Sequence, residues 1–169
     1  MRFSTPAVLA TFLASTATYV AAAAPTWPTT TYIAQLNISI TPGWTIAAPI
    51  GNRVVNEYLG GTAVDASGKK IADIVPYTGG EGGFMDKNSV FHVSTRGLLN
   101  FTDGSGYAFF TCQGIKNGTE YFWVSVDTSS TTYSFLNWAF LIGSGTKVSS
   151  ADGLTNNLIF DIFTPTPLP

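Results

Sequence analysis

The chain has 169 residues, of which 45% are hydrophobic and only 11% are charged, and its formal net charge is −2. This length suits one domain with a hydrophobic core, and the charge argues against a nucleic-acid-binding protein, which carries a basic footprint. One cysteine and one histidine exclude a disulfide scaffold and a Cys/His zinc site. We therefore expect neither a metal nor a cofactor.

The N-terminal segment has the three parts of a secretory signal peptide. Arg2 gives a positive start, the stretch Ala7–Val20 is apolar, and Ala21–Ala24 offers small residues for cleavage. A cut after Ala23 removes residues 1–23 and leaves residues 24–169 as one domain. The segment is too short and too rich in Ser and Thr for a stable membrane span, so we expect a secreted or lumenal protein.

Three Asn-x-Ser/Thr sequons support passage through a secretory pathway. Their glycan acceptors are Asn37, Asn100 and Asn117. Cys112 has no partner for a disulfide, and we expect it to be a small buried hydrophobe.

The residues after the leader predict a series of short strands. Tyr32–Ile40 alternates apolar and polar residues over nine positions, which indicates a half-buried strand with Asn37 on its polar face. Pro42-Gly43 ends this strand and opens a loop that runs to Gly51. Further strands are expected at Arg53–Leu59, Thr62–Asp65, Lys70–Val75, Val90–Arg96, Gly106–Gly114, Tyr121–Asp127, Tyr133–Ile142 and Asn157–Phe163.

Glycine-rich segments punctuate these strands. Asn117-Gly118 predicts a tight hairpin, Gly143-Ser144-Gly145 a turn, and Thr78–Phe84 a mobile flap. A Pro-rich tail begins at about residue 164. No window shows a capped helical stripe.

Eight to nine short strands joined by small turns predict an all-β fold, a single up-and-down β-barrel, with a two-sheet sandwich as the alternative. A barrel of this size can enclose one small ligand. The C-terminal half is rich in aromatic residues that either fill the core or line a cavity for an apolar or aromatic molecule: Tyr107, Phe109, Tyr121, Trp123, Tyr133, Phe135, Trp138 and Phe140.

Catalysis by a nucleophile finds little support, because the sequence lacks a Gly-x-Ser-x-Gly elbow and its carboxylates are scattered. His92 is the one side chain that titrates near neutrality unaided. Unbroken alternation to Asn100 would place it outside the barrel, unless a bulge at Gly97 resets the register. A cavity that only holds two reactants together can still catalyse a cycloaddition.

The motifs together resemble a family of small lipocalin-like barrels of unknown function in bacteria and fungi. The resemblance covers about Tyr32 to Phe163. It rests on Arg53, Gly60-Gly61, Gly79-Gly80, Arg96, Asp103-Gly104, Tyr121-Phe122, Tyr133-Ser134-Phe135-Leu136-Asn137 and Gly143-x-Gly145.

Secreted fungal members of this type are similar to the hetero-Diels–Alderases of tropolone sesquiterpenoid biosynthesis. The resemblance implies that a tropolone-derived quinone methide is joined to a sesquiterpene alkene such as a humulene derivative. It also implies a general acid or hydrogen-bond donor, for which the candidates are Tyr107, Tyr133, Asn137, Arg53 and His92. Trp44, Phe109, Trp123, Phe135 and Trp138 would contact the substrates. Trp138 departs from the arginine that bacterial members often carry there, which makes the expected site more apolar.

Three other functions remain open from the sequence. The chain could be a secreted carrier of apolar small molecules, a surface protein with a filled barrel, or a hydrolase. Association into a homo-oligomer is also left open.

Overall fold

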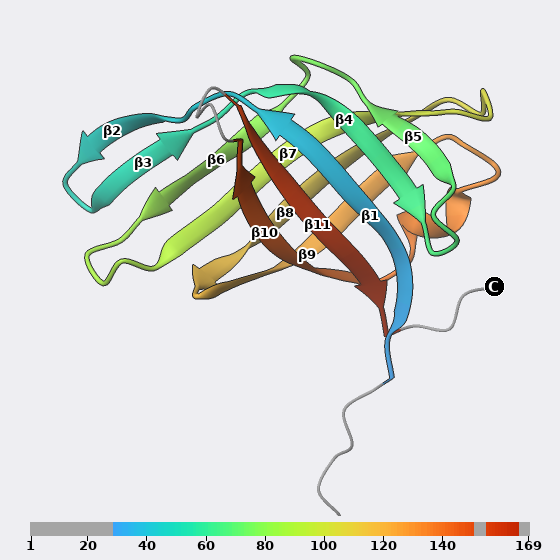
Figure 1. Cartoon of the computed structure of the whole chain (residues 1–169). Coiled ribbons are helices and arrows are strands. Elements are labelled where there is room, and N and C mark those ends of the chain that lie inside the picture. Colours follow the sequence, from blue (N-terminus) through green and yellow to red (C-terminus); the bar gives the residue numbers. More distant parts are fainter. Residues whose placement is uncertain (1–28, 151–154, 166–169) are drawn as a thin grey trace, which may run out of the picture.

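The computed structural model describes residues 29–150 and 155–165, and the predicted signal peptide lies outside these residues. The described chain is built from strands and one short 3-10 helix (Figure 1). The elements are β1 (Thr31–Ile40), β2 (Trp44–Ala48), β3 (Gly51–Val55), β4 (Tyr58–Asp65), β5 (Lys70–Ile74), β6 (Gly80–Met85), β7 (Phe91–Phe101), β8 (Tyr107–Asn117), β9 (Thr119–Thr128), η1 (Ser134–Asn137), β10 (Leu141–Ser149) and β11 (Asn156–Thr164).

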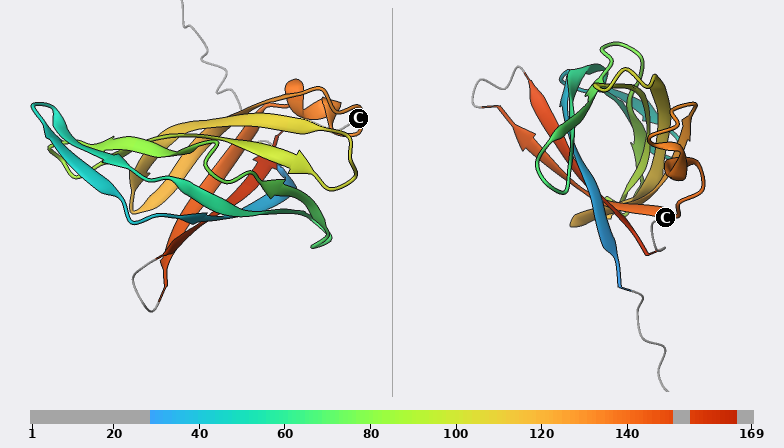
Figure 2. Two further views of the ribbon diagram at one scale, coloured as in Figure 1. Left: turned by 90° about the horizontal axis from the view of Figure 1, so that it is seen from above. Right: turned by 90° about the vertical axis from the view of Figure 1, so that its right-hand side faces the viewer.

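Eight antiparallel strands close into a barrel in the order β7-β5-β4-β1-β11-β10-β9-β8, and the β7–β8 pairing completes the ring (Figure 2, right). The predicted all-β barrel is therefore confirmed, and the sandwich alternative is wrong. The Asn117-Gly118 hairpin is also confirmed, since Asn117 pairs with Thr119 across the β8–β9 turn.

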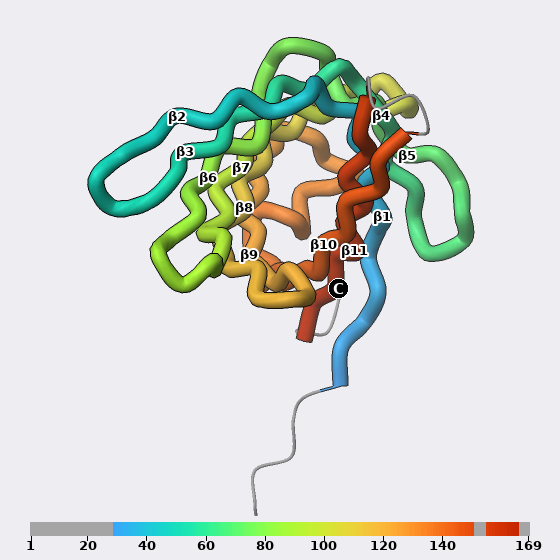
Figure 3. The backbone as a smooth tube through the Cα atoms, turned by 60° about the vertical axis from the view of Figure 1, so that its left-hand side comes forward, coloured from blue at the N-terminus to red at the C-terminus, as the bar shows by residue number. Residues whose placement is uncertain are grey.

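Strands β2, β3 and β6 extend the sheet beyond the barrel (Figures 1 and 3). This extension exists because β7 changes partner along its length: Phe91–Arg96 pairs with β6, and Leu99–Phe101 pairs with β5. Two predictions are corrected here. The expected loop before Gly51 contains β2, and the expected flap at Thr78–Phe84 is largely strand β6.

Alternation along the strands fills the barrel with apolar side chains. On β1, Leu36, Ile38 and Ile40 are buried and Asn37 is exposed, as the sequence pattern predicts. Phe110 and Phe160 occupy the middle of the barrel and are no more than 1% exposed. The barrel is thus largely a packed core.

The segment Tyr133–Ile142 is not the strand that its composition predicts. Ser134–Asn137 forms η1, and β10 starts only at Leu141. Gly143 and Gly145, expected in a turn, lie inside β10 because side chains from β9 need the space. A Cβ at Gly143 would collide with the Phe122 ring, and one at Gly145 would lie 2.8 Å from the Glu120 carboxyl carbon.

In residues 29–150 and 155–165, no helix is long and apolar enough to cross a membrane. The same residues contain no group of three or more His, Cys, Asp or Glu side chains placed to hold a metal ion.

Candidate functional site

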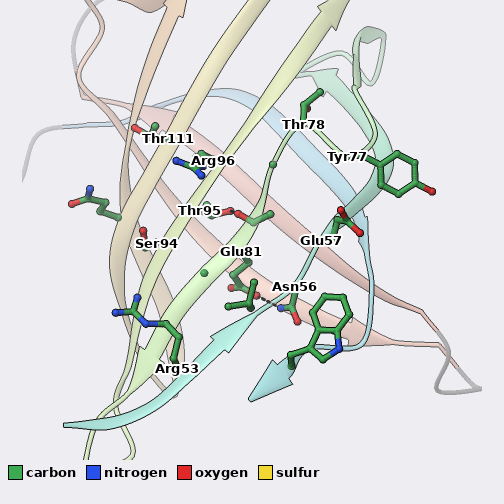
Figure 4. Close-up of a pocket in the computed structure, with 16 residues that line it drawn as sticks. Arg53, Asn56, Glu57, Tyr77, Thr78, Glu81, Ser94, Thr95, Arg96 and Thr111 are labelled. Atoms are coloured by element: carbon green, nitrogen blue, oxygen red, sulfur yellow. Dashed lines mark hydrogen bonds between the residues drawn. The ribbon is translucent and has the colours of Figure 1, made fainter. Parts of the chain in front are cut away.

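A groove of about 700 Å³ runs along β6, between β3 and β7 (Figure 4). Its volume falls within the range of about 300–1,000 Å³ that is usual for small-molecule sites. The groove is lined by Trp44, Arg53, Val55, Asn56, Glu57, Tyr77, Thr78, Gly79, Gly80, Glu81, Gly82, Ser94, Thr95, Arg96, Thr111 and Gln113.

The strand register places this groove on the outer face of the sheet. Val55, Gly82, Ser94 and Gln113 are successive cross-strand neighbours, so their side chains share one face. Ser94 and Gln113 are exposed, whereas the next residue along β7, Thr95, is buried. Gly82 has no side chain, so the floor of the groove is backbone between Val55 and Ser94.

Two arginines bring positive charge to the groove. Arg53 comes from β3 and also lies 6.0 Å from the centroid of the Phe84 ring. Arg96 comes from β7 and pairs across the sheet with Gly80. Within the described part of the chain, neither guanidinium has an ion-pair partner, so both can bind an oxygen-rich ligand.

A buried polar cluster lies on the inner side of the same strands. Asn56 Nδ2 donates a hydrogen bond to Glu81 Oε2 at 2.9 Å, and the Tyr58 hydroxyl bonds to the Thr95 hydroxyl. Burial raises the pKa of Glu81. Burial, reinforced by the nearby Glu81 charge, raises the pKa of Glu120 to about 7. These carboxyls therefore favour their protonated forms more than ordinary glutamates do.

Inside the barrel, a separate apolar cavity measures only about 190 Å³. Tyr133, Phe135 and Leu136 contribute to its lining, and Tyr133 stacks on Phe101 with ring centroids 4.1 Å apart. A cavity of roughly 150 Å³ holds one benzene ring, so this space suits one small ring rather than a sesquiterpene. The interior is not the roomy aromatic pocket expected from the sequence.

Four of the predicted aromatic site residues point away from the barrel interior. Tyr107, Phe109, Trp123 and Trp138 are between 40% and 87% exposed. Their expected placement in an internal cavity is wrong. Aromatic residues occupy outward positions on β8 and β9 as well as inward ones, and Trp138 directly follows η1. The inner positions are taken by Ala108, Phe110, Cys112, Phe122, Val124 and Val126.

Of the other predicted site residues, Trp44 and Arg53 lie in the groove. His92 lies outside the barrel, as unbroken alternation predicts, because β7 passes Gly97 without a bulge. It stacks on Phe84, and its Nε2 is 3.2 Å from Asp86 Oδ2. It does not line the groove. Cys112 is buried, as expected, and burial raises the pKa of its thiol.

Asn137 supports the backbone instead of offering a free donor. Its Oδ1 accepts from the Thr128 N–H at 2.7 Å, and its Nδ2 donates to the Thr128 carbonyl at 2.9 Å.

We expect Asn137→Ala to lower the free energy of unfolding by about 1–3 kcal/mol, because two backbone groups lose their partner. Urea unfolding checks this, with exposed Asn88→Ala as the control. An unchanged stability would contradict the structural role.

The three sequon asparagines, Asn37, Asn100 and Asn117, are all exposed on their strands.

Sequence reasoning missed the buried polar cluster, since isolated glutamates on apolar strands gave no signal for it. Arg53, Gly79-Gly80 and Arg96 all belong to the motifs that carry the family resemblance. The sequence did not show that they lie together, because this depends on the order of the strands in the sheet.

Comparisons with known proteins show the fold. No protein-family model matches the sequence, and no curated protein is significantly similar to it. A conserved protein of unknown function from Rhodopseudomonas palustris superposes with a TM-score of 0.72 at 16% identity, over 83% of this chain and 99% of that one. A β-barrel-like protein from Acinetobacter baumannii gives 0.62 at 21% identity, over 82% and 98%.

An enzyme from Penicillium herquei is also similar, with a TM-score of 0.57 at 17% identity, over 83% of this chain and 98% of that one. The barrel therefore occurs in two bacterial proteins, one of them of unknown function, and in a fungal enzyme. At these identities the likeness establishes the architecture alone.

Proposed function

We propose that this chain is a secreted enzyme that joins two small molecules in the groove by a hetero-Diels–Alder reaction. One partner is a tropolone-derived quinone methide, and the other is a sesquiterpene alkene such as a humulene derivative. The observation that carries the proposal is the convergence of Arg53, Gly79-Gly80 and Arg96 on one groove, since these residues belong to the motifs of the family that the sequence resembles.

The size and lining of the groove suit two unlike reactants. Its volume of about 700 Å³ exceeds that of the barrel cavity more than threefold. Trp44, Val55 and Tyr77 offer apolar surface for a hydrocarbon, while Arg53 and Arg96 offer donors for oxygen atoms. Holding both reactants in contact lowers the entropic part of the barrier without any covalent intermediate.

The groove also contains groups for forming the quinone methide by loss of water. Glu57 lines the groove and is exposed. Its carboxylate can accept the proton of the ring hydroxyl and return it to the departing hydroxyl, so that water leaves and the carboxylate is regenerated. The arginines then stabilise the negative charge that develops on the ring oxygen during cycloaddition. The cycloaddition forms one C–C and one C–O bond, and no atom is lost.

The proposal predicts a product of defined stereochemistry. Purified protein would be incubated with a hydroxymethyl tropolone precursor and a humulene alcohol, and the adducts separated by chiral chromatography. We expect one stereoisomer in excess, a loss of this excess with Arg96→Gln, and its retention with Lys87→Gln as the control. An adduct mixture identical to that formed without protein would overturn the proposal.

A carrier function is the second candidate, and the apolar cavity inside the barrel favours it. Such a carrier would bind a single-ring apolar molecule beside Tyr133 and release it unchanged. Native mass spectrometry of the incubated protein distinguishes the two functions, because a carrier retains unreacted ligand and generates no adduct.

A further inference from the structure

The outer face of β8 and β9 exposes several large apolar side chains. Four cross-strand pairs present their side chains outward there, and Asp127 is their one charged member: Phe109–Asp127, Thr111–Ser125, Gln113–Trp123 and Ile115–Tyr121. Tyr121 is 63% exposed, Ile115 52% and Trp123 47%. Large exposed apolar side chains that gather on one face mark an interaction site.

The same face has a hollow at one end. A depression of about 660 Å³ is lined by Leu98, Tyr107, Phe109, Asp127, Thr128, Ser129, Asn137 and Trp138. The face therefore carries a projecting indole, that of Trp123, on one side of the Thr111–Ser125 pair and a hollow on the other side. A surface with a projection and a matching hollow on either side of a central line can pair with itself.

We propose that two copies of this chain form a symmetric dimer through the outer face of β8 and β9. A two-fold axis along the small central pair, Thr111–Ser125, reverses the strand direction of the second copy. It places Trp123 of each copy over the hollow beside Asp127 of the other.

The polar groups of this arrangement are complementary. Within the described residues, the Asp127 carboxylate has no hydrogen-bond or ion-pair partner. The Trp123 indole N–H is a donor without a partner in the same part of the chain. In the dimer the indole of each copy donates to Asp127 of the other copy, which satisfies both groups as the face is buried.

The available area is close to what a stable dimer requires. Six large side chains lie on or beside the face: Tyr107, Phe109, Ile115, Tyr121, Trp123 and Trp138. An aromatic side chain buries about 150–250 Å² in full. The five aromatic side chains of this set are between 40% and 87% exposed, so together with Ile115 they contribute roughly 600 Å². With the intervening polar residues this approaches the roughly 800 Å² per partner of a standard interface.

Dimerisation would also affect the groove. Thr111 and Gln113 lie both on this face and in the groove lining, so the second copy would border the groove along β8. A bordering wall would keep water from a reactive intermediate. This consequence rests on the proposed function, whereas the dimer itself does not.

Sedimentation equilibrium of the intact mature protein tests the dimer without reference to activity. We expect twice the protomer mass at micromolar concentration and a protomer mass for Trp123→Glu, which places a second carboxylate beside Asp127. Val148→Glu is the matched control, because Val148 is 46% exposed on β10 and lies outside the four pairs. This variant should remain dimeric.

A milder pair of variants keeps the test independent of folding defects. Trp123→Phe removes only the indole donor, and Asp127→Ala removes only the acceptor. We expect each to raise the dissociation constant about tenfold or more and the double variant to add little further. A wild-type protomer mass up to about 100 μM, a dimeric Trp123→Glu variant or additive effects of the mild pair would overturn the proposal.

Discussion

Replacing Gly82 with leucine will abolish turnover and leave the fold intact. The nearest heavy atom to a Cβ at Gly82 is the Ser94 carbonyl oxygen at 3.7 Å, which is an ordinary contact. The leucine side chain would then project from the floor of the groove between Val55 and Ser94. Displacing a bound reactant in this way should cost at least about 3 kcal/mol in the transition state, or a hundredfold in kcat/KM.

Two further variants locate the effect in the groove. Gly82→Ala adds one methyl group and should keep most of the activity, while circular dichroism should show both Gly82 variants folded. Val124→Ile adds a methyl group to the barrel cavity instead and should leave kcat/KM within a few-fold of wild type. Loss of activity with Val124→Ile and full activity with Gly82→Leu would move the site into the barrel.

The free energy of unfolding will fall as the pH rises from about 4.5 to about 7. Glu120 has a pKa raised to about 7 in the folded protein, from an ordinary value of 4.5. The folded state therefore keeps a proton that the unfolded chain releases. The stabilisation is complete below pH 4.5 and is lost as the pH passes through about 7, which amounts to on the order of 3 kcal/mol. The raised pKa of Glu81 acts in the same direction.

Urea unfolding at pH 5 and pH 8 measures this dependence. Glu120→Gln removes the titrating group from a site where its Oε1 has no hydrogen-bond partner among the described residues. This variant should flatten the dependence substantially, whereas the exposed, uncharged Asn88→Ala should leave it unchanged. A wild-type protein more stable at pH 8 than at pH 5 would contradict the assignment.

Period-two patterning predicted the fold wherever one face of a strand is polar. From Ala34 to Ile40 the predicted faces agree with the structure. Tyr32 was predicted on the apolar face but lies on the outer one, because a bulge before Ala34 shifts the register. The Tyr32 hydroxyl donates to Asp161, and Ile33 packs against the core instead. In β8 and β9 both faces carry large apolar residues, so the pattern could not tell Phe109 on the outside from Phe110 on the inside.

Glycine-rich segments were the main source of error. Gly143 and Gly145 resemble a turn in sequence, but they make room for Phe122 and Glu120 from the neighbouring strand. Gly80 and Gly82 resemble a flap, but in β6 they form the floor of the groove. A glycine of this kind is required by a residue that is far away in sequence but adjacent in the sheet. A short stretch of sequence does not show which residue that is.

The candidate site was predictable only in part for the same reason. Arg53 and Trp44 were singled out from the sequence and lie in the groove. The groove itself exists because the first half of β7 pairs with β6 and the end of β7 pairs with β5. No short motif encodes this exchange of partners, so the sequence placed the ligand inside the barrel.

A crystal structure with tropolone bound tests the central claim most directly, namely that the ligand site is the groove outside the barrel. We predict the planar ring in the groove over Gly82, with its oxygen atoms about 2.7–3.2 Å from the guanidinium of Arg53 or Arg96. A ring bound inside the barrel against Tyr133 and Phe101, with the groove empty, would contradict it.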